Sequence, residues 1–204
     1  MKRAVVLLNG ELADTRLVTK IIKKSDLIVG VDGGTKQILN LKLVPDLIIG
    51  DLDSLKVLPK DVPLIRFPKD KDKTDSELAI EFLIKQGYQQ VVIGGFLGKR
   101  LDHFVSNILN LAKSKIQVQI IEGRQIIYFV KNSLTIKGEK GDLVSLIPLL
   151  VDCSGVITTG LKWPLKQEIL KIGSSLGISN EMTGTKATIK LKSGLLMLVH
   201  TKRQ

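Results

Sequence analysis

Residues 74–95, TDSELAIEFLIKQGYQQVVIGG, contain the clearest structural pattern in this chain of 204 residues. Thr74 and Glu77 have the spacing of a capping box, which begins a helix. The apolar residues that follow recur at helical spacing and predict a helix over 75–86. The short apolar run 91–93 then predicts a buried strand that ends in two glycines. A helix that leads into a buried strand is typical of an α/β fold.

The same alternation of short apolar runs and helical patterns extends over the first 122 residues. It predicts an α/β domain with a mostly parallel sheet and crossover helices. The expected strands lie at 4–8, 27–31, 47–49, 64–67, 91–93 and 117–121, and the other expected helices lie near 15–24, 35–40 and 102–113.

The sequence changes character after Gly123. Short alternating segments replace the helical pattern, as in 134–137, 187–192 and 195–199, and Gly, Asn and Ser separate them. This pattern predicts a small all-β domain, either a sandwich or a barrel. We therefore expect an α/β domain over 1–125 and a β-rich domain over 126–204.

Composition limits the classes of protein to which the chain can belong. Cys153 is the only cysteine, so no disulfide can form within the chain, and we expect a cytoplasmic location. No apolar run approaches the roughly 20 residues that a membrane helix needs. A net charge of +11 is compatible with nucleic-acid binding, but the aromatic content of 4% leaves few rings to stack on bases. We expect neither a nucleic acid nor a membrane as partner, and a basic surface also suits a protein that binds anionic nucleotides.

Polar motifs follow the predicted parallel strands, at the edge of the sheet where such folds bind ligands. The first is Asp32-Gly33-Gly34, whose glycines would let backbone amides approach a phosphate closely. A plain turn is the alternative interpretation of this motif, because Asp-Gly is common in turns.

Asp51 and Asp53 follow the third predicted strand in the segment GDLDS at 50–54. Residues two apart in an extended chain point to the same side, so the two carboxylates would lie together. Two like charges in such a position are unfavourable unless a cation joins them, and oxygen ligands of this kind suit Mg²⁺. A solvated acidic loop is the alternative.

The segment KDKTDSE at 71–77 mixes both charges directly before the capped helix. The helix dipole alone would explain Asp75 in the first turn. Asp75 could instead complete a metal site with Asp51 and Asp53, and Lys71 and Lys73 would then meet phosphates.

The last motif is GGFLGKRLDH at 94–103. Its glycines, followed by Lys99 and Arg100 at a helix start, are typical of an anion site. His103 is more often a structural residue than a base in such a place, and we do not assign it a catalytic role. Because all four motifs lie on one predicted edge, they indicate a site for a nucleotide di- or triphosphate with magnesium, but they leave the acceptor of the reaction open.

In their order along the chain and in their amino-acid sequences, these four motifs resemble the catalytic domain of thiamine pyrophosphokinases. The segments TGLKWPL at 159–165 and GISNE at 177–181 are similar to the vitamin-binding domain of the same family. The resemblance covers nearly the whole chain. It implies an enzyme that transfers diphosphate from ATP to the hydroxyl of thiamine and gives thiamine diphosphate and AMP. It also implies a homodimer with the active site at the interface.

The resemblance assigns roles to individual residues. It implies that Mg²⁺ and the ATP phosphates are held by three carboxylates, and that Asp75 or Asp102 accepts the alcohol proton. The implied catalytic residues are Asp51, Asp53, Asp75 and Asp102, of which the first three bind the metal. The resemblance places Asp32 and Arg100 at the ATP site, and the motifs themselves add the expected ATP-binding residues Gly33, Gly34, Lys71, Lys73 and Gly98. The implied thiamine-binding residues are Trp163, Ser179 and Asn180.

Other interpretations stay open at the level of the sequence. Trp163, the only tryptophan, could equally be a core or interface anchor. The same carboxylates would serve a different magnesium-dependent, ATP-using transferase or a nucleotide hydrolase. A basic nucleotide- or nucleic-acid-binding module would need neither Asp51 nor Asp53.

Overall fold

The computed structural model describes residues 1–50, 59, 61–68 and 70–203. The chain divides into two compact units, Met1–Gly123 and Arg124–Gln204. The division falls two residues before the position 125 at which the sequence pattern places it. Asp51 and Asp53 lie outside the described residues.

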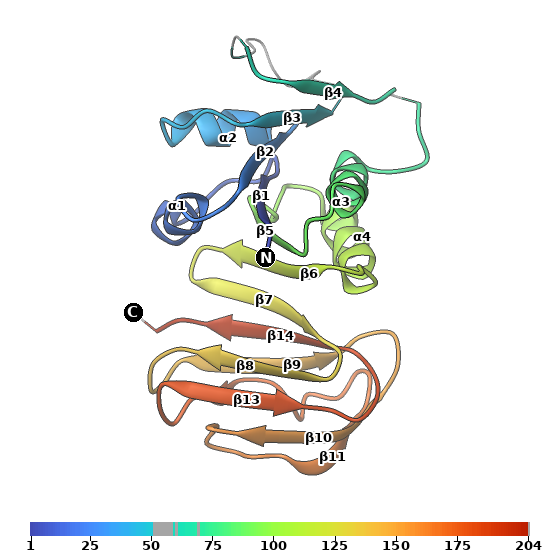
Figure 1. Ribbon diagram of the computed structural model, residues 1–204. Helices are drawn as coiled ribbons and strands as arrows, with labels where there is room; N and C mark the ends of the chain where they lie inside the picture. The colour runs from blue at the N-terminus through green and yellow to red at the C-terminus, as the bar shows by residue number, and fades with distance from the viewer. Residues whose placement is uncertain (51–58, 60, 69, 204) are drawn as a thin grey trace. The chain divides into compact units, whose positions relative to one another are not determined.

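The first unit is built on a sheet of parallel strands (Figure 1). The strands are β1 (Arg3–Leu7), β2 (Leu27–Val31), β3 (Leu47–Gly50), β4 (Leu64–Arg66), β5 (Gln90–Gly94) and β6 (Gln117–Glu122). Their order across the sheet is β6-β5-β1-β2-β3-β4. The chain therefore progresses in one direction from β1 to β4 and in the other from β5 to β6. The point between β1 and β5, where the direction changes, is where open α/β sheets bind ligands.

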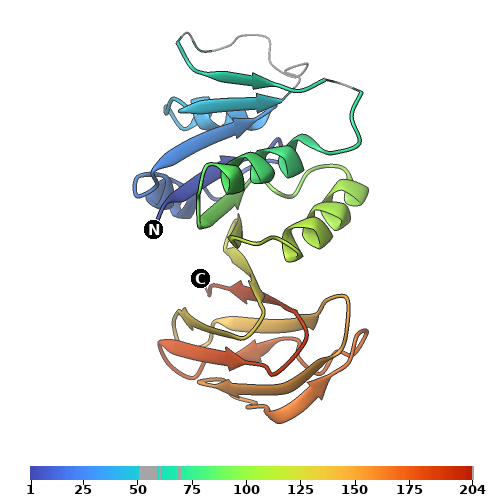
Figure 2. The ribbon, with the colours of Figure 1, turned by 45° about the vertical axis from the view of Figure 1, so that its right-hand side comes forward.

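Helices cover both faces of this sheet (Figures 1 and 2). On one face α1 (Thr15–Ile22) and α2 (Gly34–Asn40) bury Val18 and Ile38 against Val5 and Leu7 of β1. On the other face lie α3 (Asp75–Lys85) and α4 (Leu101–Ala112). Val5 and Leu7 point to the same face because side chains alternate along a strand.

The predicted α/β architecture of this unit is confirmed, and the ends of its elements differ from the expected ones by no more than two residues. The largest difference is at α1, which ends at Ile22 instead of residue 24. There the N–H groups of Lys24 and Ser25 bond to carbonyls three residues back, at 2.9 and 3.0 Å. The hydroxyl of Ser25 also donates to the carbonyl of Ile22 at 2.7 Å. These bonds tighten the last turn and close the helix early.

The second unit is a sandwich of antiparallel strands, so of the two predicted β folds the sandwich is the one present. One layer has the order β12-β9-β14-β7 and the other has the order β11-β10-β13-β8. The buried core between the layers includes Leu146, Val156, Ile189 and Leu196. The strands are β7 (Gln125–Val130), β8 (Ser133–Lys137), β9 (Leu143–Pro148), β10 (Cys153–Thr159), β11 (Lys166–Leu170), β12 (Asn180–Glu181), β13 (Lys186–Lys190) and β14 (Leu196–Thr201).

The expected strand over 187–192 is too long at its end. β13 ends at Lys190, because the next two N–H groups leave its ladder. Leu191 donates to the carbonyl of Asn132 at 2.9 Å and Lys192 donates to that of Ser154 at 2.9 Å. The last strand shows the opposite difference. β14 continues to Thr201, beyond the expected end at 199, because Thr201 still pairs with Gln125 and Leu143.

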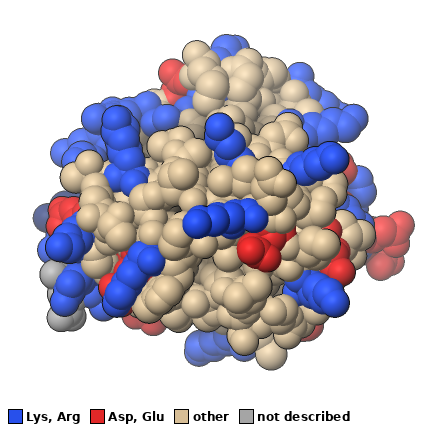
Figure 3. Space-filling view, turned by 90° about the horizontal axis from the view of Figure 1, so that it is seen from below, with Lys and Arg blue, Asp and Glu red and all other residues tan. Residues whose placement is uncertain are grey.

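Figure 3 shows Lys and Arg side chains scattered over the face seen from below, with acidic side chains among them. Within the described residues, no helix is both long and apolar enough to cross a membrane.

Candidate functional site

A cavity of 960 Å³ lies at the carboxyl ends of β1, β2 and β5 in the first unit. Its volume is in the range of about 300–1,000 Å³ that is usual for ligand pockets. It coincides with the change of direction between β1 and β5. Three of the predicted motifs, 32–34, 71–77 and 94–103, contribute described residues to its walls. These residues include Asp32, Lys71, Lys73, Thr74, Asp75, Gly98, Lys99, Arg100 and His103.

The floor of this cavity is backbone. The loop after β1 meets the loop after β5, where the N–H of Gly10 donates to the carbonyl of Gly95 at 2.8 Å. A Cβ on Gly10 would lie 2.4 Å from that oxygen, so only glycine allows this approach. Gly95 itself has a φ of 64°, which also favours glycine. The sequence analysis missed Asn9-Gly10, although a polar residue and a glycine at a strand end were a signal for it.

The Asp32-Gly33-Gly34 motif divides between two roles. Asp32 lines the cavity, and its φ of 48° places it in the left-handed region. Its Oδ1 lies against Gly50, where a Cβ would stand 1.7 Å away, so the carboxylate extends toward the end of β3. Gly33 and Gly34 are outside the described cavity lining and pack against the loop after β1. A Cβ on Gly34 would lie 1.8 Å from the carbonyl oxygen of Leu7, so close packing alone requires these glycines.

The third motif joins a helix cap to an ion pair. The Oγ1 of Thr74 accepts the N–H of Glu77 at 3.2 Å, as the predicted cap requires. The ammonium of Lys71 donates to Oδ1 of Asp75 at 2.7 Å, and both side chains are largely buried. Lys73 pairs with Glu81 at the surface. The predicted carboxylate and both predicted lysines therefore line one cavity, and each lysine already has an acidic partner.

The fourth motif presents cations at an exposed segment. The guanidinium of Arg100 pairs with Asp102, with Nη2 to Oδ2 at 2.5 Å and Nε to Oδ1 at 3.2 Å. These bonds lower the pKa of Asp102 to about 2. Of the described residues in this motif, Asp102 does not line the cavity, and those that do are Gly95, Phe96, Gly98, Lys99, Arg100 and His103. A carboxylate with so low a pKa is a weak proton acceptor, so Asp102 is better suited to orient Arg100 than to act as a base.

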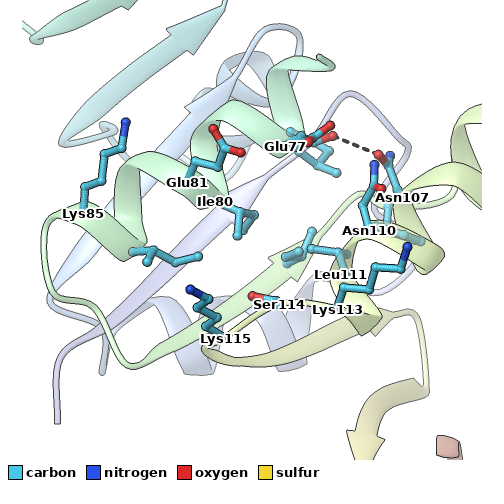
Figure 4. A pocket seen from close by; sticks show the side chains of 15 residues that line it. Glu77, Ile80, Glu81, Lys85, Asn107, Asn110, Leu111, Lys113, Ser114 and Lys115 are labelled. Atoms are coloured by element: carbon cyan, nitrogen blue, oxygen red, sulfur yellow. Dashed lines mark hydrogen bonds between the residues drawn. The ribbon is translucent and has the colours of Figure 1, made fainter. Parts of the chain in front are cut away.

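A second cavity, of 510 Å³, lies between α3 and α4 beside the first (Figure 4). The two cavities share the lining residues Leu8, Ser76, Phe96 and Asn107. The hydroxyl of Ser76 donates to Oδ1 of Asn107 at 3.0 Å, which ties the first turn of α3 to α4. The sequence analysis singled out neither Ser76 nor Asn107. The signal that the sequence offered for Asn107 was a polar residue on the apolar face of the expected helix, and the structure leaves only 9% of it exposed.

In the second unit the structure brings the predicted residues Trp163 and Asn180 into contact. The N–H of Trp163 donates to Oδ1 of Asn180 at 3.1 Å, and Nδ2 of Asn180 donates to the carbonyl of Trp163 at 2.6 Å. Ser179 precedes Asn180 with a φ of 56°, and its N–H donates to Oγ of Ser145 at 3.0 Å. The indole is 54% exposed, so Trp163 is no core anchor. The ammonium of Lys162 lies 4.6 Å from the centre of the indole ring.

The described part of the chain holds no group of three or more His, Cys, Asp and Glu residues placed to bind a metal. Of the three predicted magnesium ligands, only Asp75 belongs to that part. Its carboxylate shares the cavity with Asp32, Lys71 and Arg100, so oxygen donors and cations lie together there.

Comparison with known protein families gives two matches. Residues 18–121 match the family model "Thiamin pyrophosphokinase, catalytic domain" and residues 131–196 match "Thiamin pyrophosphokinase, vitamin B1 binding domain".

Among curated proteins, a thiamine pyrophosphokinase of Bacillus subtilis is 31% identical over 186 residues, which cover 86% of this chain and 87% of the relative. A thiamin pyrophosphokinase 1 of Caenorhabditis elegans is 26% identical and matches 94% of this chain and 86% of its own. The crystal structure of the Bacillus subtilis thiamine pyrophosphokinase superimposes with a TM-score of 0.88 at 26% identity, with both chains covered in full. The structure of a yeast thiamin pyrophosphokinase, at 18% identity, has the same fold with a TM-score of 0.78 and covers 98% of this chain and 86% of its own.

Proposed function

Because the chain belongs to the thiamine pyrophosphokinase family, we propose that the 960 Å³ cavity of its first unit binds ATP and that the Trp163 surface of its second unit binds thiamine. The chain is an enzyme that transfers diphosphate from ATP to the hydroxyl of thiamine, which gives thiamine diphosphate and AMP. The observation that supports the ATP site best is the position of the cavity. It lies where the strand order reverses and combines a glycine floor with cations.

The charges around the cavity suit a polyphosphate chain. Lys71, Lys73, Lys99 and Arg100 supply cations along the wall, and Gly10 and Gly95 keep the floor free of side chains. Lys71 and Lys73 are held by Asp75 and Glu81, so a bound phosphate would compete with these carboxylates for the two ammonium groups. We expect Lys71 to turn from Asp75 to a phosphate when ATP binds.

We assign Mg²⁺ to Asp51, Asp53 and Asp75. Oxygen donors alone make up this set, which is the ligand chemistry that Mg²⁺ prefers. The described residues fit the assignment, since Asp75 lines the cavity and the Asp32 carboxylate lies over Gly50, the residue before Asp51. When bound, the metal would neutralise charge on the phosphates that Lys71 and Arg100 do not reach.

The protein contributes mainly position and charge to the reaction. The thiamine hydroxyl attacks the β-phosphorus of ATP, the bond between the α- and β-phosphates breaks, and AMP leaves with the electron pair of that bond. Asp75 is the better candidate to accept the hydroxyl proton, because it lines the cavity and Asp102 does not. Asp102 would hold the guanidinium of Arg100 toward the phosphates.

The second unit would bind thiamine through Trp163, Asn180 and Ser179. The indole face already attracts the ammonium of Lys162, which lies at a distance suited to a cation–π contact. The thiazolium cation of thiamine would take the same kind of position. Asn180 fixes the backbone of Trp163 through two hydrogen bonds and so sets the direction of the ring.

We further propose a homodimer in which the ATP cavity of one chain faces Trp163 of the other. Two exposed apolar features support an interface of this kind. The indole of Trp163 is more than half exposed, and Leu101, Val105 and Leu109 form an exposed stripe on α4 at a spacing of four residues. A cytoplasmic location stays a prediction, supported by the single, buried thiol of Cys153.

Phosphorus NMR of the protein with ATP, Mg²⁺ and thiamine tests the reaction. We expect AMP and thiamine diphosphate to appear together in equal amounts. Formation of ADP would point to a different ATP-using transferase, and free phosphate would point to a nucleotide hydrolase. Absence of turnover with thiamine would contradict the proposal.

A further inference from the structure

Glu122, the last residue of β6, connects two neighbouring strand ends. Its Oε2 accepts the N–H groups of Phe96 and Leu97, both at 3.1 Å, from the loop that follows β5. Burial raises the pKa of Glu122, although the two N–H groups act in the opposite direction. The carboxylate is therefore kept in a partly buried place by the loop that it binds, which distinguishes it from an ordinary surface acid.

The loop that Glu122 holds forms walls of both cavities. Phe96, only 4% exposed, lines each of them, and its ring packs edge-on against Phe104 with centroids 5.6 Å apart. One residue earlier, Gly95 is fixed by its bond from Gly10. Two residues later the packing around the loop ends, because a Cβ on Gly98 would meet nothing within 4 Å.

Within the described residues, the bonds to Glu122 are thus the last hydrogen bonds from a side chain to the loop backbone before the exposed segment 98–100. That segment carries Lys99 and Arg100 to the cavity. Rotation of the backbone at Leu97 would move both Lys99 and Arg100. If the N–H of Leu97 is held in place, the positions that these two side chains can occupy are restricted. Glu122 lies outside the described lining of the cavity, so any effect on the nucleotide must pass through the loop.

We infer that Glu122 is a positioning residue for the nucleotide site, which sets the place of Lys99 and Arg100 by clamping the amides of Phe96 and Leu97. The inference rests on the proposed function, because it takes the 960 Å³ cavity as the ATP site. It makes ATP binding depend on Glu122 of β6, although this strand contributes no described residue to the cavity.

Two variants of Glu122 and one matched control test the inference. Glu122→Ala removes the acceptor, whereas Glu122→Gln keeps an oxygen that can accept both N–H groups. Asp46→Ala is the control, because Asp46 also accepts a backbone N–H, that of Ile28 at 2.8 Å, but lies at the amino end of β3, away from the cavity.

We expect Glu122→Ala to raise the KM for ATP about tenfold or more, from the loss of two charge-assisted hydrogen bonds, and to leave the KM for thiamine within about twofold. Glu122→Gln should restore the KM for ATP to within about threefold of the wild-type value. Asp46→Ala should leave both KM values unchanged, whatever it does to the melting temperature. A wild-type KM for ATP in Glu122→Ala would overturn the inference, as would equal changes in Glu122→Ala and Asp46→Ala.

Hydrogen exchange separates this test from the test of the reaction. Without any substrate, the amides of Phe96 and Leu97 should exchange faster in Glu122→Ala than in the wild type, while amides of β1 should not change. If the wild-type protein fails to make thiamine diphosphate but the loop amides still lose protection, the proposed function fails and the clamp stands. If the two amides keep their protection in Glu122→Ala, the clamp itself is wrong.

Discussion

In the first unit the candidate site residues lie on loops at the carboxyl edge of a parallel sheet, whereas in the second unit they lie on the outside of a sandwich. The loops of the first unit line an open cavity of 960 Å³. The second unit presents Trp163 with its indole 54% exposed and its backbone held by Asn180. The first unit thus provides a hollow lined by charged side chains, whereas the second provides an exposed aromatic surface.

This difference separates two kinds of contribution to the reaction. In the proposed function, charged groups around the cavity act on the phosphates, where the bonds change, so their loss should lower the rate. The exposed aromatic surface is proposed to bind the acceptor, so its loss should mainly weaken binding. This distinction between the two units would be wrong if substitutions in both changed the same kinetic constant by similar factors.

The largest effect should come from the carboxylates of the first unit. We expect Asp75→Asn to lower kcat on the order of a hundredfold or more, because the variant loses a charge beside the transferred phosphates. The melting temperature should fall only modestly, because the Asn side chain can still accept the ammonium of Lys71 and the lost helix-dipole contact contributes only about 1 kcal/mol. Asp51→Asn and Asp53→Asn should behave in the same way.

Steady-state kinetics and circular dichroism measure the two quantities. Asp72→Asn is the matched control, because Asp72 is an exposed carboxylate three residues before Asp75. If Asp75→Asn kept most of its activity, Asp75 would have only the structural role that the helix start explains.

The sandwich of the second unit should depend strongly on a buried pair. Oδ2 of Asp142 lies 2.7 Å from Nε2 of His200, and both side chains are almost inaccessible. The carboxylate also accepts the N–H groups of Arg203 at 2.8 Å and Glu139 at 3.0 Å. Asp142→Ala would leave these groups without their acceptor and should lower the free energy of unfolding by about 3 kcal/mol.

The same pair should make the stability of the protein depend on pH. Burial alone would raise the pKa of Asp142, but the hydrogen bonds from Arg203, Glu139 and His200 outweigh it and hold the pKa below its usual value. A lowered pKa means that the stabilisation is present above the unfolded value near pH 4 and is lost as pH falls through the folded value. Thermal unfolding between pH 6 and pH 3 should show a smaller loss in Asp142→Asn than in the wild type. Asp152→Asn, which alters an exposed carboxylate of the same unit, should keep the wild-type slope.

An intermediate effect is expected at the surface of the second unit. Trp163→Ala should raise the KM for thiamine about tenfold through loss of contact area and the cation–π term. Trp163→Phe should recover part of this loss because it keeps an aromatic face. The melting temperature should not change, since the indole is largely exposed. An unchanged KM for thiamine in Trp163→Ala would remove this residue from the site.

Mixed dimers test whether the exposed surface is covered by a second chain. In a dimer of Asp75→Asn with Trp163→Ala, one site would contain both changes and the other would contain neither. With thiamine well below its wild-type KM, both parents should be poorly active, and the mixed dimer should regain about half of the wild-type activity. If purified mixed dimers were no more active than the Trp163→Ala parent under this condition, each site would be formed within one chain.

Much of the fold and part of the candidate site follow from local sequence patterns. The capping pair Thr74 and Glu77 marked the start of α3, and glycines at strand ends marked the loops around the cavity. Contacts between residues far apart in the sequence left no such pattern. Glu122 binds Phe96 and Leu97 only because β6 lies beside β5, and His200 meets Asp142 across 58 residues. The partner of Arg100 was also missed, because the motif contains several charges and only geometry selects Asp102.

The smallest effect should distinguish the exposed ion pair of the first unit from the buried pair of the second. Arg100 and Asp102 are both well exposed, and their hydrogen bonds lower the pKa of Asp102 to about 2. Because water and ions reach this pair, 0.5 M salt should move the carboxyl titration of Asp102, followed by carbon-13 NMR, back toward about 3.9. Arg100→Gln should do the same at low salt. The Asp142 titration should respond much less to salt, since the buried pair is shielded from ions.

Asp102→Asn leaves Arg100 in the cavity wall but removes the carboxylate that pairs with its guanidinium. This variant should raise the KM for ATP by less than about fivefold. A loss of kcat as large as that of Asp75→Asn would instead make Asp102 the proton acceptor and return Asp75 to the role of metal ligand alone.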